Sequence, residues 1–218
     1  RSKSPQRALD ELVHLTEQHP GLDVWVVDNI LDMKYFQSFL PELARRDLGL
    51  DIFYETKSNL RKDQVRLLRD AGVRRIQPGI ESLSDSVLSL MRKGVGALQN
   101  IQLLKWAKEF GVELDWNFIW GFPGEDPNAY AEMARLLPHL DHLQPPELSL
   151  GILLDRFSPN FVESERFGFS DIAPFPSLRH VYPFTQFVHG EEEGDPAVFQ
   201  VSQQLPATVI VHPGNKGS

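Results

Sequence analysis

The sequence predicts an α/β fold on a parallel sheet, either open or curled into a partial barrel, and we favour the barrel. Short apolar runs of strand length alternate with amphipathic stretches of helix length from about residue 23 to residue 154. Connections of that length between strands favour right-handed crossovers, which make neighbouring strands parallel. The chain has 218 residues, 41% of them hydrophobic and 24% charged, which suits one sizeable core.

The first half of the chain sets up this alternation. Ser4 followed by Pro5 predicts a helix start, because the serine hydroxyl accepts a hydrogen bond from an otherwise unpaired amide and proline suits the first turn. The run "DVWVVDN", about residues 23–29, is short, β-branched and aromatic, which is typical of a buried strand. A helix over about 33–46, a strand "DIFYET" and a helix "RKDQVRLLRDAG" closed by Gly72 follow.

The second half continues the pattern and then loses it. We expect a strand "RIQPGIE", helices "SDSVLSLMRK" and "ALQNIQLLKWAKEFG", a strand "ELDWNFIW", a helix opened by Asp126, and a strand "ELSLGILL". Regularity fades beyond "LDRFSPNF", and "HGEEEGDP" has the composition of a solvated acidic stretch. We therefore expect a barrel over residues 1–184 and a loosely ordered tail over 185–218.

Charge and composition exclude several classes of partner. Lys and Arg number 22 against 30 Asp and Glu, so a net charge of -8 disfavours nucleic acid and anionic membranes as partners. The chain holds no apolar run approaching the roughly 18 residues of a membrane span, and we expect a cytoplasmic protein. It holds no cysteine, which excludes disulfides and thiolate metal sites within these residues. His139 and His142 lack a third ligand, so no metal site is predicted in this chain.

Four of the predicted strands place polar side chains at or near their ends. Asp28 and Asn29 follow "VWVV", Glu55 follows "DIFY", Glu81 follows "IQPGI", and Asn117 lies inside "WNFIWGFPGE". Ligands of parallel α/β barrels bind at the carboxyl ends of the strands, so these groups are candidates for one shared site. Carboxylates accept hydrogen bonds from hydroxyl and ammonium groups, and a ribose would suit Glu81. Paired carboxylates also suit the acid/base chemistry of a glycosidase, so a carboxylate-dependent hydrolase stays an alternative.

Four segments in order resemble the radical SAM superfamily. They are "VDNILDMKYF", "YETKSNL", "LLRDAGVRRIQPGIESLSDSVLSLMRKGV" and "WNFIWGFPGE", and the resemblance is closest to the cobalamin-binding branch. More narrowly, "RSKSP" and "HLQPPELSLGILLDRFSPNF" look like the radical SAM C-methyltransferases that mature ribosomally made peptides. The resemblance covers about residues 1–184. It implies a partial TIM-type (β/α)6 barrel, here incomplete at its N-terminal strand.

The resemblance assigns expected roles toward S-adenosylmethionine (SAM). Glu81 stands where the family binds the ribose of SAM, and Glu55 stands at the matching end of the preceding strand. Lys93 falls where relatives place a basic residue toward the methionine carboxylate, with Arg92 as the register alternative. Asn117 falls where relatives hold the ribose or adenosyl group.

Further roles follow from the same resemblance. Asp28 and Asn29 replace the family's Gly-Gly-Glu motif, which receives the methionine amino group. The residues expected to flank the adenine are Ile119, Gly121, Phe122 and Pro123. Arg156 is a candidate for the substrate side of the barrel, and a salt bridge to the barrel's own acidic residues is an equal alternative. No catalytic residue is singled out.

The family cleaves SAM at a 4Fe–4S cluster held by a CxxxCxxC loop, and this chain has no cysteine. We therefore interpret it as the C-terminal portion of an enzyme whose cluster loop and cobalamin domain lie upstream, and which is inactive as it stands. The implied parent uses SAM, the cluster and cobalamin to methylate a carbon of a precursor peptide. The alternative is a non-catalytic barrel that binds an adenosyl ligand or a peptide. The oligomeric state is not predicted.

Overall fold

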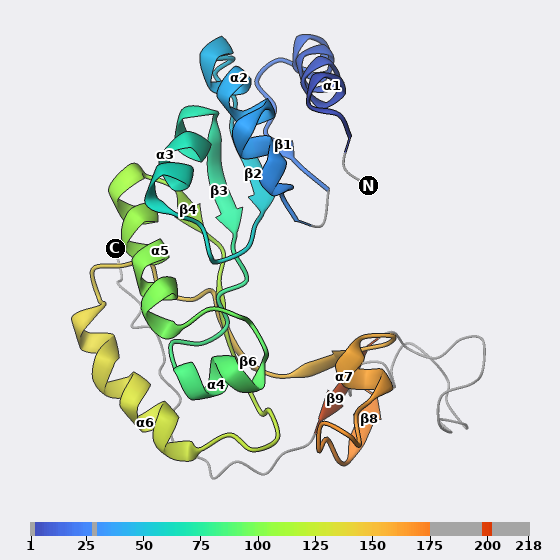
Figure 1. Ribbon diagram of the computed structural model, residues 1–218, viewed down its shortest axis with the longest axis vertical. Coiled ribbons are helices and arrows are strands. Elements are labelled where there is room, and N and C mark those ends of the chain that lie inside the picture. The colour runs from blue at the N-terminus through green and yellow to red at the C-terminus, as the bar shows by residue number, and fades with distance from the viewer. Residues whose placement is uncertain (1–2, 28–29, 175–197, 202–218) are drawn as a thin grey trace, which may run out of the picture. The chain divides into compact units, whose positions relative to one another are not determined.

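A computed structural model describes residues 3–27, 30–174 and 198–201 (Figure 1). The chain forms two compact units, Arg1–Leu150 and Gly151–Ser218. The expected boundary between residues 184 and 185 lies outside the described residues and stays a prediction. Among the described residues, no helix is both long enough and apolar enough to cross a membrane.

The first unit is built on a sheet whose neighbouring strands are all parallel. The strands lie in the order of the sequence, as β1 (Val24–Trp25), β2 (Ile52–Glu55), β3 (Val73–Gln77) and β4 (Glu113–Leu114). Helical segments connect them, as the alternating pattern predicts. The predicted α/β class with a parallel sheet is confirmed.

Helices start where the sequence provides caps. The helical segments of this unit are α1 (Pro5–Gln18), η1 (Met33–Gln37), α2 (Phe39–Arg46), α3 (Lys62–Asp70), α4 (Asp85–Leu90), α5 (Ala97–Phe110), α6 (Pro127–Leu136) and η2 (Leu137–His139). The Ser4 side chain accepts a hydrogen bond from the amide of Arg7 at 3.3 Å, and Asp126 accepts one from the amide of Asn128 at 2.9 Å. Both predicted helix starts are therefore confirmed.

The core lies between the sheet and the helices α2, α3 and α5, of which α3 and α5 lie to the left of the sheet in Figure 1. Leu40, Val65 and Leu103 from these helices and Ile76 and Leu114 from the strands are fully buried. Burial of each such side chain contributes roughly 1.5–3 kcal/mol. Helices this short are only marginally stable by themselves, so packing against the sheet provides most of their stability.

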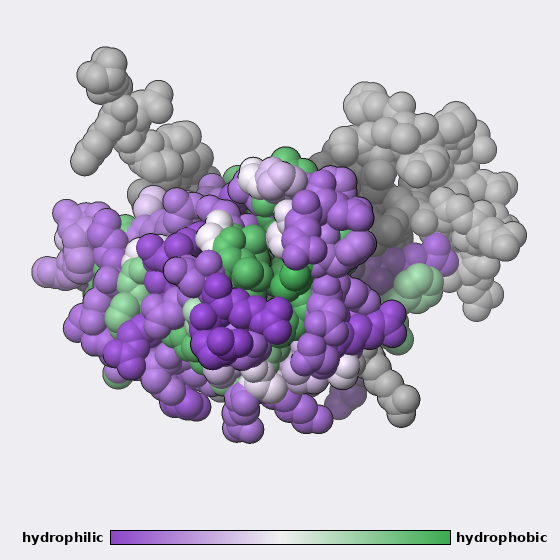
Figure 2. Space-filling model, turned by 90° about the horizontal axis from the view of Figure 1, so that it is seen from above, coloured by the Kyte–Doolittle hydropathy of each residue, from purple (hydrophilic) through white to green (hydrophobic). Residues whose placement is uncertain are grey.

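The two ends of the sheet differ in character. The strand arrows in Figure 1 point away from α1 and α2, so the view from above in Figure 2 faces the end where the strands begin. Apolar residues gather in the middle of that face within a hydrophilic rim. Leu22 and Leu48, which precede β1 and β2, are exposed. The polar groups of the candidate site follow the strands and belong to the opposite end.

Two predicted elements are shorter than expected. The helix expected over 33–46 is interrupted at Ser38, whose φ of -141° lies outside helical geometry, and it is divided into η1 and α2. The strand expected over 23–29 is regular only at Val24–Trp25. Its last two residues, Asp28 and Asn29, lie outside the described residues.

A bulge between β3 and its neighbour divides another predicted strand. Ile76 accepts a hydrogen bond from the amide of Asp115 at 2.9 Å, and Ile80 accepts the next one, from Asn117 at 3.2 Å. Between these two hydrogen bonds the segment after β3 advances from residue 76 to 80, whereas the neighbouring segment advances only from 115 to 117. The extra residues around Gly79 therefore bulge out. The predicted strand "ELDWNFIW" is therefore divided into β4 and β5 (Asn117–Trp120), which belong to different sheets.

The predicted strand "ELSLGILL" is also divided. Its first half is β6 (Leu148–Gly151), which pairs with β5, and its second half is β7 (Leu153–Asp155). In the second unit β9 (Val198–Val201) pairs antiparallel with both β7 and β8 (Ile172–Pro174). The short helix α7 (Pro159–Val162) is capped by Ser158, which accepts from the amide of Phe161 at 3.2 Å.

The side chain of Gln144 takes the place of a strand beside β4. Its Oε1 accepts from the amide of Leu114 at 2.9 Å, and its Nε2 donates to the carbonyl of Leu114 at 2.8 Å. The Gln144 carbonyl also accepts from Nε1 of the buried Trp116 at 3.0 Å. One side chain therefore satisfies both backbone groups of a fully buried strand residue.

Replacing Gln144 should destabilise the first unit measurably. In Gln144→Ala both backbone groups of Leu114 lose their partners, so we expect the free energy of unfolding to fall by about 2 kcal/mol. Urea unfolding followed by circular dichroism measures the change. Gln102→Ala, an exposed site on α5, is the matched control and should change stability by less than about 0.5 kcal/mol. Equal effects of the two substitutions would contradict this account.

Candidate functional site

The centre of the candidate site is an ion pair between Glu81 and Lys93. Lys93 Nζ lies 2.6 Å from Glu81 Oε1, and the two side chains are 28% and 24% exposed. Glu81 follows the bulge after β3, and Lys93 follows α4. Partial burial weakens solvent screening, so this pair is held more firmly than one on the open surface.

Backbone hydrogen bonds on both sides hold the Glu81 segment in place. The Glu81 carbonyl accepts from the amide of Ile119 at 2.9 Å, which fixes the segment against β5. The next carbonyl, that of Ser82, accepts from Nδ2 of Asn100 at 3.0 Å. Asn100 is fully buried on α5, so its amide ties this segment to the helix layer. The carboxylate of Glu81 is therefore carried by a fixed backbone.

Asn117, beside this segment, carries an unpaired buried acceptor. Its Oδ1 is buried and has no hydrogen-bond partner among the described residues, while its backbone amide donates to Ile80. Leaving a buried acceptor unpaired costs about 1–3 kcal/mol, so this atom suits a donor supplied by a ligand. Gly79, in the left-handed region with a φ of +64°, leaves the approach to Lys93 Nζ without a side chain.

The loop after β5 is held by Glu125. Its Oε2 accepts from the amide of Gly121 at 2.8 Å and from the hydroxyl of Tyr130 at 2.6 Å. Burial and the adjacent Glu125 carboxylate together raise the pKa of the Tyr130 hydroxyl well above its ordinary value of 10.0. These bonds shape the loop that contains Phe122, which is buried, and Pro123, which is partly buried, two of the residues expected to flank an adenine.

The other expected site residues are distributed as follows. Glu55 ends β2, is partly buried, and lies opposite Gln77 of β3. Asp28 and Asn29 are not among the described residues, so their expected roles stay predictions. Arg156 belongs to the second unit, where its guanidinium lies 5.0 Å from the ring centre of Phe157.

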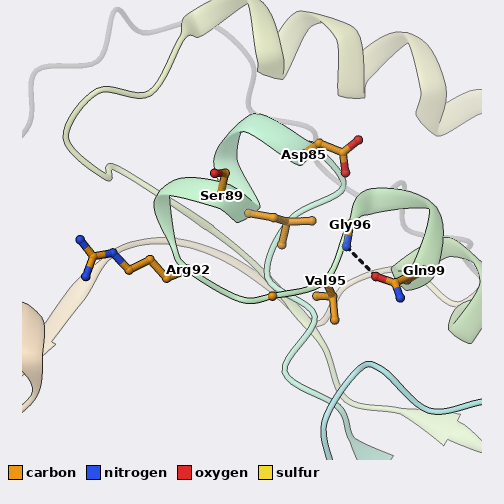
Figure 3. A pocket seen from close by; sticks show the side chains of 8 residues that line it. Asp85, Ser89, Arg92, Val95, Gly96 and Gln99 are labelled. Carbon is orange, nitrogen blue, oxygen red and sulfur yellow. Dashed lines mark hydrogen bonds between the residues drawn. The ribbon is translucent and has the colours of Figure 1, made fainter.

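Arg92, the register alternative to Lys93, lies at a different place. It lines an open hollow of about 420 Å³ between α4 and α5 (Figure 3). Around this hollow the amide of Gly96 donates to Oε1 of Gln99 at 2.9 Å, and Asp85 accepts from the amide of Ala97 at 2.7 Å. The structure therefore brings Glu81 together with Lys93, Ile119 and the Asn117 segment, and it places Arg92 at the hollow.

Two residues that build the site were missed by the sequence analysis. Asn100 lies inside a helix and bonds to Ser82 in another segment, whereas Glu125 lies in a turn and bonds to the nearby Tyr130. For Asn100 a signal did exist, because a polar amide at a buried helix position requires a partner. Glu125 is the last residue of the run "GFPGE", but that pattern assigns no role to its carboxylate.

The residues of this chain do not fit an iron–sulfur cluster. Such clusters are held by cysteine thiolates, and the sequence has none. Within the described ranges, no group of three His, Asp or Glu side chains could hold a metal ion instead. What the arrangement does offer is a carboxylate, a cation and a buried amide oxygen at the carboxyl ends of parallel strands.

Comparison with known families identifies the fold. The family model of the radical SAM superfamily matches residues 1–137. The chain belongs to the radical SAM superfamily. An uncharacterized methyltransferase of Pyrococcus horikoshii is 27% identical over 144 residues, which are 65% of this chain and 31% of that protein. The anaerobic magnesium-protoporphyrin IX monomethyl ester cyclase of Rubrivivax gelatinosus is 26% identical over 141 residues, 62% of this chain and 25% of that protein.

Solved structures of this radical SAM class share the fold at low identity. The methyltransferase TsrM from Kitasatospora setae, with cobalamin and a 4Fe–4S cluster bound, superposes with a TM-score of 0.64 at 21% identity, covering 76% of this chain and 32% of that chain. The cobalamin-dependent SAM radical enzyme OxsB gives a TM-score of 0.55 at 20% identity, over 67% and 24%. The predicted partial TIM-barrel class is confirmed, and this radical SAM chain spans about a third or less of each of these four proteins.

The raised pKa of Tyr130 predicts an alkaline loss of stability. A group whose pKa is raised on folding stabilises the folded state below its unfolded pKa and loses that effect as the pH rises. Stability of the unaltered chain should therefore fall above about pH 10, by up to about 1.4 kcal/mol per pH unit from this group. In Tyr130→Phe that component should be missing, so the slope should be shallower.

Urea unfolding at pH 9, 10 and 11 measures this slope for both proteins. Taking the difference between them removes the contribution of the lysines, which titrate in the same range. Parallel slopes would show that Tyr130 ionises normally.

Proposed function

We propose that this chain forms the nucleoside-binding part of a radical SAM methyltransferase, and that the complete protein uses cobalamin to methylate a carbon of a ribosomally made precursor peptide. The observation that supports the proposal most directly is the Glu81–Lys93 pair, whose Glu81 segment is hydrogen-bonded to the backbone of Asn117, a residue with a buried Oδ1 that has no partner among the described residues. SAM carries vicinal hydroxyls, which suit a carboxylate, and a methionine carboxylate, which suits an ammonium group.

Each group of the site has a place in this proposal. Glu81 accepts hydrogen bonds from the ribose hydroxyls, because an anionic acceptor binds neutral donors more strongly than a neutral one does. Lys93 holds the methionine carboxylate, and Asn117 accepts a donor of the adenosyl group at its buried oxygen. The Gly121 to Glu125 loop lies against the flat adenine, since Glu125 fixes its backbone.

The proposal assigns the thiolates of the cluster to residues outside the 218 printed here. The chain offers no thiolate, so we derive no step of SAM cleavage through its own side chains. The chain spans only about a third of these relatives, which agrees with assigning the cluster ligands to residues outside it.

Two parts of the proposal rest on likeness alone. The methyltransferase and cobalamin parts are supported by the relatives named above. The peptide substrate is supported by the resemblance of "HLQPPELSLGILLDRFSPNF" to peptide-maturing enzymes. The hydrolase alternative needs a second carboxylate beside Glu81, whereas the charged partner of Glu81 in the described part of the chain is Lys93.

Removing the charge of Glu81 should weaken binding of a SAM analogue. In Glu81→Gln the ribose hydroxyls lose an anionic acceptor, so we expect the affinity for S-adenosylhomocysteine to fall about 10-fold or more, on the order of the 1.5–3 kcal/mol of a charged hydrogen bond. Isothermal titration calorimetry with the 218-residue chain measures it.

The matched control for this variant is Glu109→Gln. Glu109 also pairs with a lysine, Lys62, at 2.6 Å, but it lies on the outer surface of α5. The control should bind like the unaltered chain. If Glu81→Gln also kept full affinity, or if the unaltered chain bound no S-adenosylhomocysteine, the proposed site would be wrong.

A further prediction concerns iron and sulfide. After anaerobic reconstitution this chain should show no visible absorption of a bound cluster and no 5'-deoxyadenosine above the protein-free control, because it has no soft ligands. A coding sequence that continues upstream should contain CxxxCxxC about ten residues before Arg1, the loop position that the family resemblance implies. A brown, SAM-cleaving 218-residue chain would contradict this division of the active site.

A further inference from the structure

In this structure Glu81, assigned to the ribose of SAM, and Lys93, assigned to its methionine carboxylate, form an ion pair with each other. We infer that the Glu81–Lys93 pair is a latch that makes the site selective for nucleosides that carry a carboxylate, and against nucleosides that have only the ribose and the base. This inference rests on the proposed function, since it takes the ribose role of Glu81 and the carboxylate role of Lys93 from it.

The geometry of Lys93 supports a latch. Residues 92 and 94 on either side of it are both left-handed, with φ values of 55° and 69°, and the Lys93 amide donates to the carbonyl of Leu88 at 3.2 Å. This turn closes α4 and lets the lysine side chain reach back to the strand end. Its Nζ lies 3.7 Å from where a side chain of Gly79 would begin, so the ammonium lies over the bulge itself.

The energetics of exchange then separate two kinds of ligand. A ligand with hydroxyls alone must take Glu81 from Lys93, and it removes the anion that pairs with this partly buried ammonium in the described part of the chain. A ligand that also carries a carboxylate offers Lys93 a new anion as it takes Glu81. Only the ligand with a carboxylate gives new partners to both Glu81 and Lys93. The ion pair therefore opposes binding of the ligand that has hydroxyls alone.

The latch also affects which product stays bound after SAM loses its methionine part. A nucleoside freed of its carboxylate competes with the re-forming ion pair for Glu81, so the pair favours release of such a product. The same competition keeps free nucleosides from occupying the site.

The test compares two ligands on the 218-residue chain and its Lys93→Met variant. S-adenosylhomocysteine carries the carboxylate, and 5'-methylthioadenosine lacks it. In Lys93→Met we expect the affinity for 5'-methylthioadenosine to rise about 3- to 10-fold, because Glu81 is no longer paired, while that for S-adenosylhomocysteine falls about 10-fold. Lys62→Met, at the surface pair with the same 2.6 Å separation, is the control and should change neither affinity.

Further variants make the outcome decisive. Lys93→Arg keeps the cation and should keep the discrimination between the ligands. Adding Glu81→Gln to Lys93→Met should abolish the gain for 5'-methylthioadenosine. Lys93→Gln replaces Lys93→Met in the comparison if circular dichroism shows that the methionine variant is unfolded.

Each result has one interpretation. If the loss of Lys93 lowers the affinity for S-adenosylhomocysteine but leaves that for 5'-methylthioadenosine unchanged or lower, Lys93 contacts the carboxylate without acting as a latch, and the inference is overturned while the proposed function stands. If Lys93→Met changes neither affinity, the latch is also overturned. Failure of the unaltered chain to bind either ligand overturns the proposed function and the latch together.

Discussion

The bulge around Gly79 is the constraint on which the arrangement of the site depends. It interrupts the pairing of β3 with the next strand after Ile76 and restarts it at Ile80 and Glu81. The same few residues therefore serve as a neighbour for β5 and as the carrier of the carboxylate. Gly79 allows this because its left-handed φ of +64° is a conformation in which a side chain would be strained.

The Glu81–Lys93 pair and the groups described around it come from one continuous stretch of chain, whereas Glu55 lies on β2. Residues from Gly79 to Tyr130 supply the carboxylate, the cation, the buried amide oxygen and the braced loop. A stretch of this kind forms its own hydrogen-bonded unit through α4, α5 and β5. This stretch offers no thiolate ligand for an iron–sulfur cluster, because the chain has no cysteine.

The sequence predicted those parts of the structure that depend on local pattern. The positions of Glu81 and Asn117 were predictable because each follows or begins a short apolar run, and strand ends face the ligand in this class of fold. Lys93 was assigned only through the family resemblance, because no local rule selects it over Arg92. The structure distinguishes them by the left-handed turn that directs Lys93 toward Glu81.

What the sequence could not predict depends on contacts between distant residues. The division of "ELDWNFIW" into two strands follows from the bulge on a neighbouring strand, and nothing within those eight letters indicates it. The roles of Asn100, Glu125 and Gln144 likewise depend on partners that lie far along the chain or across a turn. Polar side chains that pair with backbone groups do not create a periodic pattern, so periodicity cannot reveal them.

The pairing of β5 with the Glu81 segment also determines how that segment can move. The backbone of Glu81 cannot leave its place unless the amides of Asn117 and Ile119 first release the carbonyls of Ile80 and Glu81. Those two amides exchange with solvent deuterium only when they are released. Their exchange rates therefore record how often the Glu81 segment comes loose, and they can be measured on this chain by itself.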